Sequence, residues 1–129
     1  MKVSLPVYID VPKKTKKDQR VYLNLNVYRN LNSFLNGQTK TLFGERVGWL
    51  FRGKKFRTPL RMIFTYYSGS KMKKDLSNVC IVVDKFICDV LVKEGCIEDD
   101  SIAEIPEVDY RYGGLDPGNA RVDLEIVEI

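Results

Sequence analysis

The sequence has 129 residues, is 44% hydrophobic, and carries 21 Lys and Arg residues against 17 Asp and Glu residues, which gives a formal net charge of +4. This length and apolar content suit one compact domain over residues 1–129, and no membrane span or signal peptide is recognisable, so we expect a soluble, cytoplasmic protein without a membrane partner. The absence of histidine excludes Ser-His-Asp and Cys-His mechanisms and leaves a carboxylate, a lysine or a metal-bound hydroxide as any general base.

The N-terminal residues alternate between apolar and polar side chains. This pattern predicts a strand within Lys2–Val11, and Pro6 favours an edge position because proline cannot donate a ladder hydrogen bond. The following segment, Pro12–Arg20, is strongly basic and has no apolar periodicity. It is either a solvated loop or an arm that contacts phosphates. Its candidate nucleic-acid-binding residues are Lys13, Lys14, Lys16, Lys17 and Arg20.

The next three segments differ in how clearly their patterns define a structure. Val21–Arg29 is either extended or the lead-in to a helix. Apolar residues at roughly helical intervals predict a helix over Asn32–Arg52 that breaks, if at all, near Gly44. Pro59–Tyr67 is rich in residues that favour strands and predicts a strand.

A short basic loop, Ser68–Lys74, precedes the clearest helix of the chain. From Val79 to Leu91 the apolar residues form one stripe at helical spacing. Asp75 is suited to the N-cap and Gly95 to the position just after the C-cap. The loop adds Lys71, Lys73 and Lys74 to the candidate nucleic-acid-binding residues.

Three cysteines lie at positions 80, 88 and 96. Their spacing of eight residues matches no zinc knuckle or ribbon, and the sequence has no histidine to complete a zinc site. We therefore expect buried, reduced thiols.

The C-terminal part predicts two strands, Ile102–Tyr112 and Ala120–Ile129, after an acidic turn at Glu98–Ser101. Residues 113–118 are expected to join them as a long hairpin loop. The order of strand, helix, strand, helix and hairpin predicts an α/β or α+β domain, in which two main helices cover a mixed β-sheet.

Charge is divided unevenly along the chain. Residues 1–74 contain 17 Lys and Arg against 3 Asp and Glu, whereas residues 75–129 contain 4 against 14. This division predicts a basic surface for a polyanion and a separate acidic element that either binds cations or only solvates the fold.

The acidic residues suggest metal-dependent phosphodiester hydrolysis, because Mg²⁺ prefers two or three converging carboxylates and keeps several waters. The candidate metal ligands are Asp75, Asp99 and Asp100. Asp75 begins the long helix, and the Asp99–Asp100 pair follows its far end, about 30 Å away if the helix has about 20 residues. They can meet only if the helix is short or bent, or if a dimer partner brings the two ends together.

The second half of the chain contains a series of charged motifs around the long helix. They are Lys73-Lys74-Asp75-Leu76-Ser77-Asn78, Lys85, Asp89-Val90-Leu91-Val92-Lys93-Glu94-Gly95 and Asp99-Asp100. With these motifs, the region Pro59–Ile129 resembles the C-terminal two-thirds of the RusA-like Holliday-junction resolvases. The four-residue step from Lys85 to Asp89 and the five-residue step from Gly95 to Asp100 both match that family.

The resemblance implies a RusA-like fold and a homodimeric endodeoxyribonuclease that resolves four-way DNA junctions by paired nicking. It implies Mg²⁺, or Mn²⁺ in its place, held by Asp75, Asp100 and Asp99, with Lys85 as a further catalytic residue that stabilises the phosphate or leaving oxygen. It implies no nucleotide cofactor. It also suggests a phage or prophage setting in DNA recombination, repair or packaging, and hence the host cytoplasm.

Two departures from the family pattern open alternatives. Ser77 stands where the family has a second metal-binding aspartate, and the interval from Asn78 to Lys85 is four residues longer. Glu98 or the Ser77 hydroxyl is a possible replacement ligand, whereas helical geometry disfavours Asp84. The alternatives are a junction-binding protein with weakened or lost catalysis, and a protein-interaction module steered by its acidic half.

Overall fold

The computed structural model describes all residues from 1 to 129 and contains six strands, three α-helices and one 3-10 helix. In chain order these are β1 Lys2–Leu5, β2 Tyr8–Val11, β3 Gln19–Tyr22, α1 Leu25–Asn30, α2 Ser33–Val47, η1 Gly48–Phe51, β4 Leu60–Ser68, α3 Leu76–Lys93, β5 Glu107–Leu115 and β6 Arg121–Glu128.

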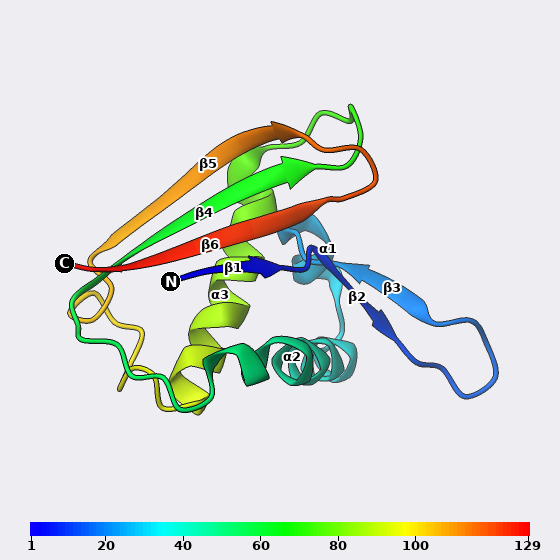
Figure 1. The fold of residues 1–129 in the computed structure, drawn as a ribbon. Helices are drawn as coiled ribbons and strands as arrows, with labels where there is room; N and C mark the ends of the chain where they lie inside the picture. The colour runs from blue at the N-terminus through cyan, green and yellow to red at the C-terminus, as the bar shows by residue number, and fades with distance from the viewer.

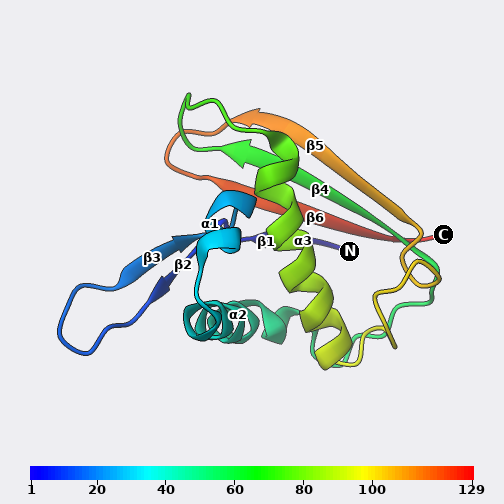
Figure 2. The same cartoon turned by 180° about the vertical axis from the view of Figure 1, so that it is seen from behind.

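A four-stranded mixed sheet in the order β1-β6-β4-β5 forms the body of the protein (Figure 1). Strand β5 runs parallel to β4, whereas β6 is antiparallel to both β4 and β1. The predicted α+β class with a mixed sheet is confirmed. One face of the sheet packs against α3, and α2 packs against α3 and β2 (Figure 2).

The predicted C-terminal hairpin is wrong. Strands β5 and β6 do not pair, because β4 lies between them. Residues 113–115 belong to β5, and only residues 116–120 form the connection, which passes the end of β4. Residues 102–106 form a turn in place of the expected start of a strand. Strand β4 is the most buried strand and therefore takes a central position, whereas β5 is largely exposed and forms an edge.

Pro6 separates two short strands where one was expected. Strand β1 forms the edge of the main sheet, as predicted, but β2 pairs with β3 in a separate antiparallel hairpin. We call this hairpin, residues 8–22, the arm. Figure 1 shows it projecting from the body of the protein. The ambiguous segment Val21–Arg29 contains both the end of β3 and the short helix α1.

Helix α2 runs through Gly44 without a break, so the break that the sequence left open there does not occur. Its N-cap is Asn32, whose side-chain oxygen accepts a hydrogen bond from the Leu35 amide at 2.8 Å. The helical pattern changes at Gly48, where η1 begins. Helix α3 ends as predicted, since Gly95 has φ +76° and the amides of Gly95 and Cys96 bond to Val92 and Leu91 carbonyls in a Schellman arrangement.

The hydrophobic core is one cluster of 29 buried residues. The apolar stripe of α3 meets the buried face of β4 and β6, where Phe64 lies opposite Leu124. Phe86 of α3 also packs edge-on against Phe43 of α2, with ring centroids 5.6 Å apart, and lies 6.2 Å from the ring of Tyr28. This residue therefore joins α3 to both α1 and α2.

All three cysteines are buried and free, which confirms the expectation of reduced thiols. The second face of the sheet is mostly polar and has no helix packed on it, as Figure 1 shows. No helix of the structure is both long enough and apolar enough to cross a membrane.

The role of Phe86 in joining the three helices can be measured. Phe86→Ala should lower the free energy of unfolding by about 3–5 kcal/mol, because the side chain is 2% exposed and its removal leaves a cavity. Urea denaturation measures this change. Phe34→Ala is the matched control, since Phe34 is 75% exposed on α2. Equal losses in the two variants would contradict this account of the core.

Candidate functional site

A cleft of about 740 Å³ lies where the arm, the loop of residues 69–75 and the turn of residues 116–120 meet. We call the loop the basic loop and the turn the end turn. Figures 1 and 2 show the three segments at one end of the molecule, opposite the two chain termini. The charged side chains that line the cleft are Arg20, Arg46 and Lys74, and no carboxylate lines it. The cleft is therefore suited to an anionic ligand.

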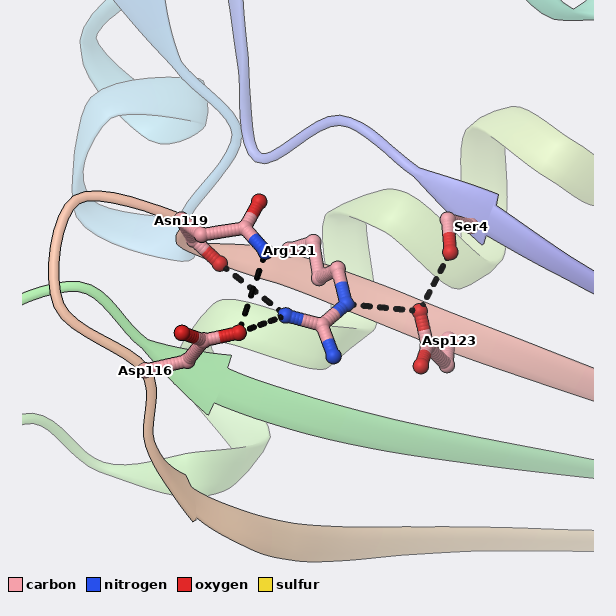
Figure 3. A network of polar contacts seen from close by, with 5 residues as sticks. All are labelled: Ser4, Asp116, Asn119, Arg121 and Asp123. Carbon is pink, nitrogen blue, oxygen red and sulfur yellow. Dashed lines mark hydrogen bonds and ion pairs between the residues drawn. The ribbon is translucent and has the colours of Figure 1, made fainter.

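An arginine holds the end turn against the sheet (Figure 3). The Arg121 guanidinium donates to the Asp116 carboxylate at 2.7 Å and to Asp123 at 3.2 Å, and it covers the ring of Tyr67 at 4.1 Å. Asp123 also accepts a hydrogen bond from the Ser4 hydroxyl of β1. Arg121 and nearby Asn119 hold the pKa of Asp116 below its ordinary value. These contacts fix one wall of the cleft.

Arg20 is partly neutralised at the base of the arm. Its guanidinium donates to both oxygens of Asp10, at 2.9 and 3.3 Å, and lowers the pKa of that carboxyl. The same guanidinium lies 3.9 Å from the centroid of the Tyr8 ring. By contrast, the predicted lysines of the arm tip make no salt bridge and are exposed; they are Lys13, Lys14, Lys16 and Lys17.

The basic loop brings its predicted lysines to the same end of the molecule. Lys71, Lys73 and Lys74 line a second pocket, of about 350 Å³, that shares several residues with the cleft. The Lys74 ammonium lies 6.0 Å from the centroid of the Tyr22 ring on the arm. The structure therefore places the basic loop beside the base of the arm, although the two segments are about 50 residues apart in sequence.

Asp75 occupies the predicted N-cap position of α3, but its side chain makes no capping hydrogen bond. It is exposed and lines a polar pocket of about 650 Å³ together with Asn24, Asn78, Lys73 and Lys74. A cap alone therefore does not account for Asp75. The other polar residues of this pocket are two lysines and three asparagines, and no second carboxylate lines it.

Asp100 and Lys85 line a different pocket, of about 430 Å³, beside the middle of α3. We call it the acidic pocket, because Asp84 also lines it. Asp84 accepts hydrogen bonds from the Tyr110 hydroxyl at 2.6 Å and the Cys88 thiol at 3.3 Å. Asp99 makes a local turn contact, in which its carboxylate accepts from the Asp100 amide at 2.8 Å.

The three predicted metal ligands do not fit one magnesium site within a single chain. Asp75 precedes Asp84 by nine residues, which is about 14 Å along a helix, and Asp100 lies beside Asp84. No group of three or more Asp, Glu, Cys or His side chains is placed to hold a metal ion. Ser77 and Glu98, the suggested replacement ligands, are exposed and line neither pocket.

Sequence reasoning disfavoured Asp84, yet this residue is the most unusual carboxyl of the acidic pocket. Burial raises its pKa, and the charge of Asp100 raises it further, while the hydrogen bonds from Tyr110 and Cys88 oppose the change. Burial and the contact with Asp84 in turn raise the pKa of Tyr110, so the phenol remains a donor. The available signal was the position of Asp84 directly after Val83, at the margin of the apolar stripe.

No family model matches the sequence, and no curated protein matches it significantly.

The burial of Asp84 predicts a pH dependence of stability. Because its pKa in the folded state lies above the unfolded value of about 3.9, the protonated carboxyl stabilises the fold below that pH, and this contribution is lost as the pH rises through the folded-state pKa. Asp84→Asn keeps an oxygen acceptor for Tyr110 and has no carboxyl to ionise. As the pH rises above about 4, the variant should therefore lose less stability than the wild type.

Urea denaturation across this pH range measures the effect. Asp89→Asn, at an exposed position on the same helix, controls for the loss of one negative charge. Wild-type and Asp84→Asn curves that stay parallel across the range would contradict the prediction.

Proposed function

We propose that this chain binds branched DNA through the phosphate backbone, at the end of the molecule formed by the arm, the basic loop and the end turn. The observation that carries the proposal is the cleft of about 740 Å³, whose charged side chains are all cationic. Each phosphate contact made by a lysine or arginine releases counterions and so favours binding at low salt.

The distribution of the cations favours a branched ligand over a straight duplex. Lysines of the arm tip lie away from the body, whereas those of the basic loop lie at the end of β4. A four-way junction presents backbones that diverge from one point and can reach both groups. Backbone contacts carry no base specificity, which agrees with recognition by shape. The resemblance of Lys73–Asp100 to the RusA-like resolvases supports the same ligand, in the cytoplasm or in the host cytoplasm of a phage.

A second candidate function is Mg²⁺- or Mn²⁺-dependent nicking of the bound junction by a homodimer, as the resemblance implies. The specific observation in its favour is that two carboxylates and a lysine, Asp84, Asp100 and Lys85, line one pocket. Asp75 lies too far along α3 to join them in one chain. Cleavage through the predicted ligands therefore requires a second copy of the chain to supply one end of the site, while Ser77 leaves one family carboxylate absent.

Salt dependence tests the binding proposal. Replacing Lys71, Lys73 and Lys74 by Gln should weaken junction binding and reduce the slope of log affinity against log salt by about 1 for each phosphate that the variant no longer neutralises. Fluorescence anisotropy with a labelled four-way junction measures both quantities. Lys54→Gln with Lys55→Gln is the control, since these lysines follow η1 and do not line the cleft. No binding by the wild type at low salt would refute the proposal and favour a protein-interaction module.

Gel analysis of the same junction separates binding from cleavage. If the second candidate is correct, the wild type nicks the junction only with Mg²⁺, and Asp100→Asn abolishes the nicks while retaining binding. If the chain only binds, the wild type leaves the junction intact, and Ser77→Asp is the variant expected to gain activity, because it restores the carboxylate of the family pattern. A linear duplex of equal length serves as the control substrate.

A further inference from the structure

We propose that the cleft holds one unpaired nucleotide of a DNA strand, with its base stacked on Tyr22. This inference rests on the proposed function and names the part of a branched DNA that the cleft recognises. Its volume of about 740 Å³ is within the usual range of small-ligand sites. A duplex keeps its bases stacked and paired, so only an unpaired nucleotide can enter.

Tyr22 is the aromatic side chain of the cleft best placed for stacking. It is 45% exposed, whereas Tyr66 is 5% exposed and belongs to the core. The ring of Tyr8 is already covered by the Arg20 guanidinium at 3.9 Å. Tyr8 supports Tyr22 from the side, with ring centroids 5.9 Å apart and planes inclined by 60°. Tyr22 is therefore a braced, solvent-facing ring, and aromatic rings of this kind stack on bases with little sequence preference.

The cations of the cleft are placed for the phosphates on either side of that base. Arg20 is paired with Asp10, but Arg46 and Lys74 make no salt bridge. The Lys74 ammonium lies 6.0 Å from the centroid of the Tyr22 ring. When a base stacks on Tyr22, the Lys74 ammonium can therefore reach the phosphate of the same nucleotide. A tyrosine buried in the core would have no such cation beside it.

Asn24 supplies a hydrogen-bonding group at the same place. Its side-chain oxygen accepts from the Val27 amide at 3.0 Å and caps α1, so the side chain is held in one orientation. Its amide nitrogen makes no hydrogen bond within the protein and remains available to the ligand. Asn24 can therefore donate to the acceptor edge of a base or to a phosphate oxygen.

Binding experiments with three DNAs test the inference: a fully paired four-way junction, the same junction with one unpaired thymine at the branch point, and a duplex. The wild type should prefer the junction with the unpaired thymine. Tyr22→Leu should lower affinity for that DNA by about tenfold and so remove its preference over the fully paired junction, whereas Tyr22→Trp should retain the preference. Trp49→Leu, at an aromatic residue that is 62% exposed and outside the cleft, should behave like the wild type.

Photocrosslinking identifies the contact directly. With 5-iodouracil in place of the unpaired thymine, we expect an adduct on Tyr22 in the wild type and none in Tyr22→Leu. Free thymidine monophosphate should compete only weakly, because it lacks the flanking phosphates. Strong competition would assign the cleft to a free nucleotide and overturn the inference.

The outcomes separate the two proposals. Failure of the wild type to bind any DNA would overturn both. Tight junction binding without a preference for the unpaired thymine, or with the same preference in Tyr22→Leu, would overturn the stacking inference and leave backbone binding standing.

Discussion

The packing of α3 against the buried face of β4 determines where the basic loop and the acidic pocket lie. The apolar stripe of α3 and the face of β4 that contains Phe64 belong to one core. Because the helix is held along the sheet, the basic loop that connects β4 to α3 must lie at one end, with Asp75 as the last residue before the helix. Asp84, in the middle of the same helix, faces Tyr110 of β5. One hydrophobic contact thus keeps the basic end and the acidic pocket apart.

The central position of β4 has a second consequence. Since β5 and β6 flank β4, the chain must pass the end of β4 to connect them, and the end turn therefore lies beside the basic loop. A backbone hydrogen bond of 3.1 Å from the Gly118 amide to the Gly69 carbonyl joins the two segments. Arg121 of β6 donates to Asp116 of the turn and to Asp123, and Asp123 in turn accepts from Ser4 of β1. Strand order, and not local sequence, forms this side of the cleft.

The separation of Asp75 from Asp100 gives the proposed binding and the proposed cleavage different structural requirements. One chain supplies every residue that lines the cationic cleft, so the proposed backbone binding does not depend on a second copy of the chain. A metal centre built from the predicted carboxylates is not complete within one chain. In the acidic pocket, the Tyr110 hydroxyl and the Cys88 thiol each donate a hydrogen bond to one carboxylate oxygen of Asp84. Both oxygens therefore have a hydrogen-bond partner without a cation. This arrangement and the presence of Ser77 favour the proposed junction binding over the proposed cleavage.

The amino-acid sequence alone determined the elements that depend on residues close together along the chain. The stripe from Val79 to Leu91 specifies α3, and the composition of β4 specifies a strand. Gly95 specifies the helix end, because the φ of +76° at this position strongly favours glycine. The charge division also indicated a basic surface. These features need no knowledge of distant residues, since each follows from periodicity, burial or backbone freedom.

Only the tertiary structure decided which distant groups meet. The two strands on either side of Pro6 pair in different sheets, and β4 lies between the two strands that were expected to form a hairpin. Tyr22 of the arm lies near Lys74, although the two residues are about 50 positions apart in the sequence. Helical angle disfavoured Asp84 as a replacement ligand, and it gave no sign that Tyr110 of β5 donates a hydrogen bond to this residue. Helical spacing fixes the direction of a side chain relative to its own helix, whereas its burial and pKa depend on what other elements pack there. The sequence therefore identified the candidate acids and lysines, and the fold determined that Asp75 lies beside the basic loop whereas Asp100 lies in the acidic pocket.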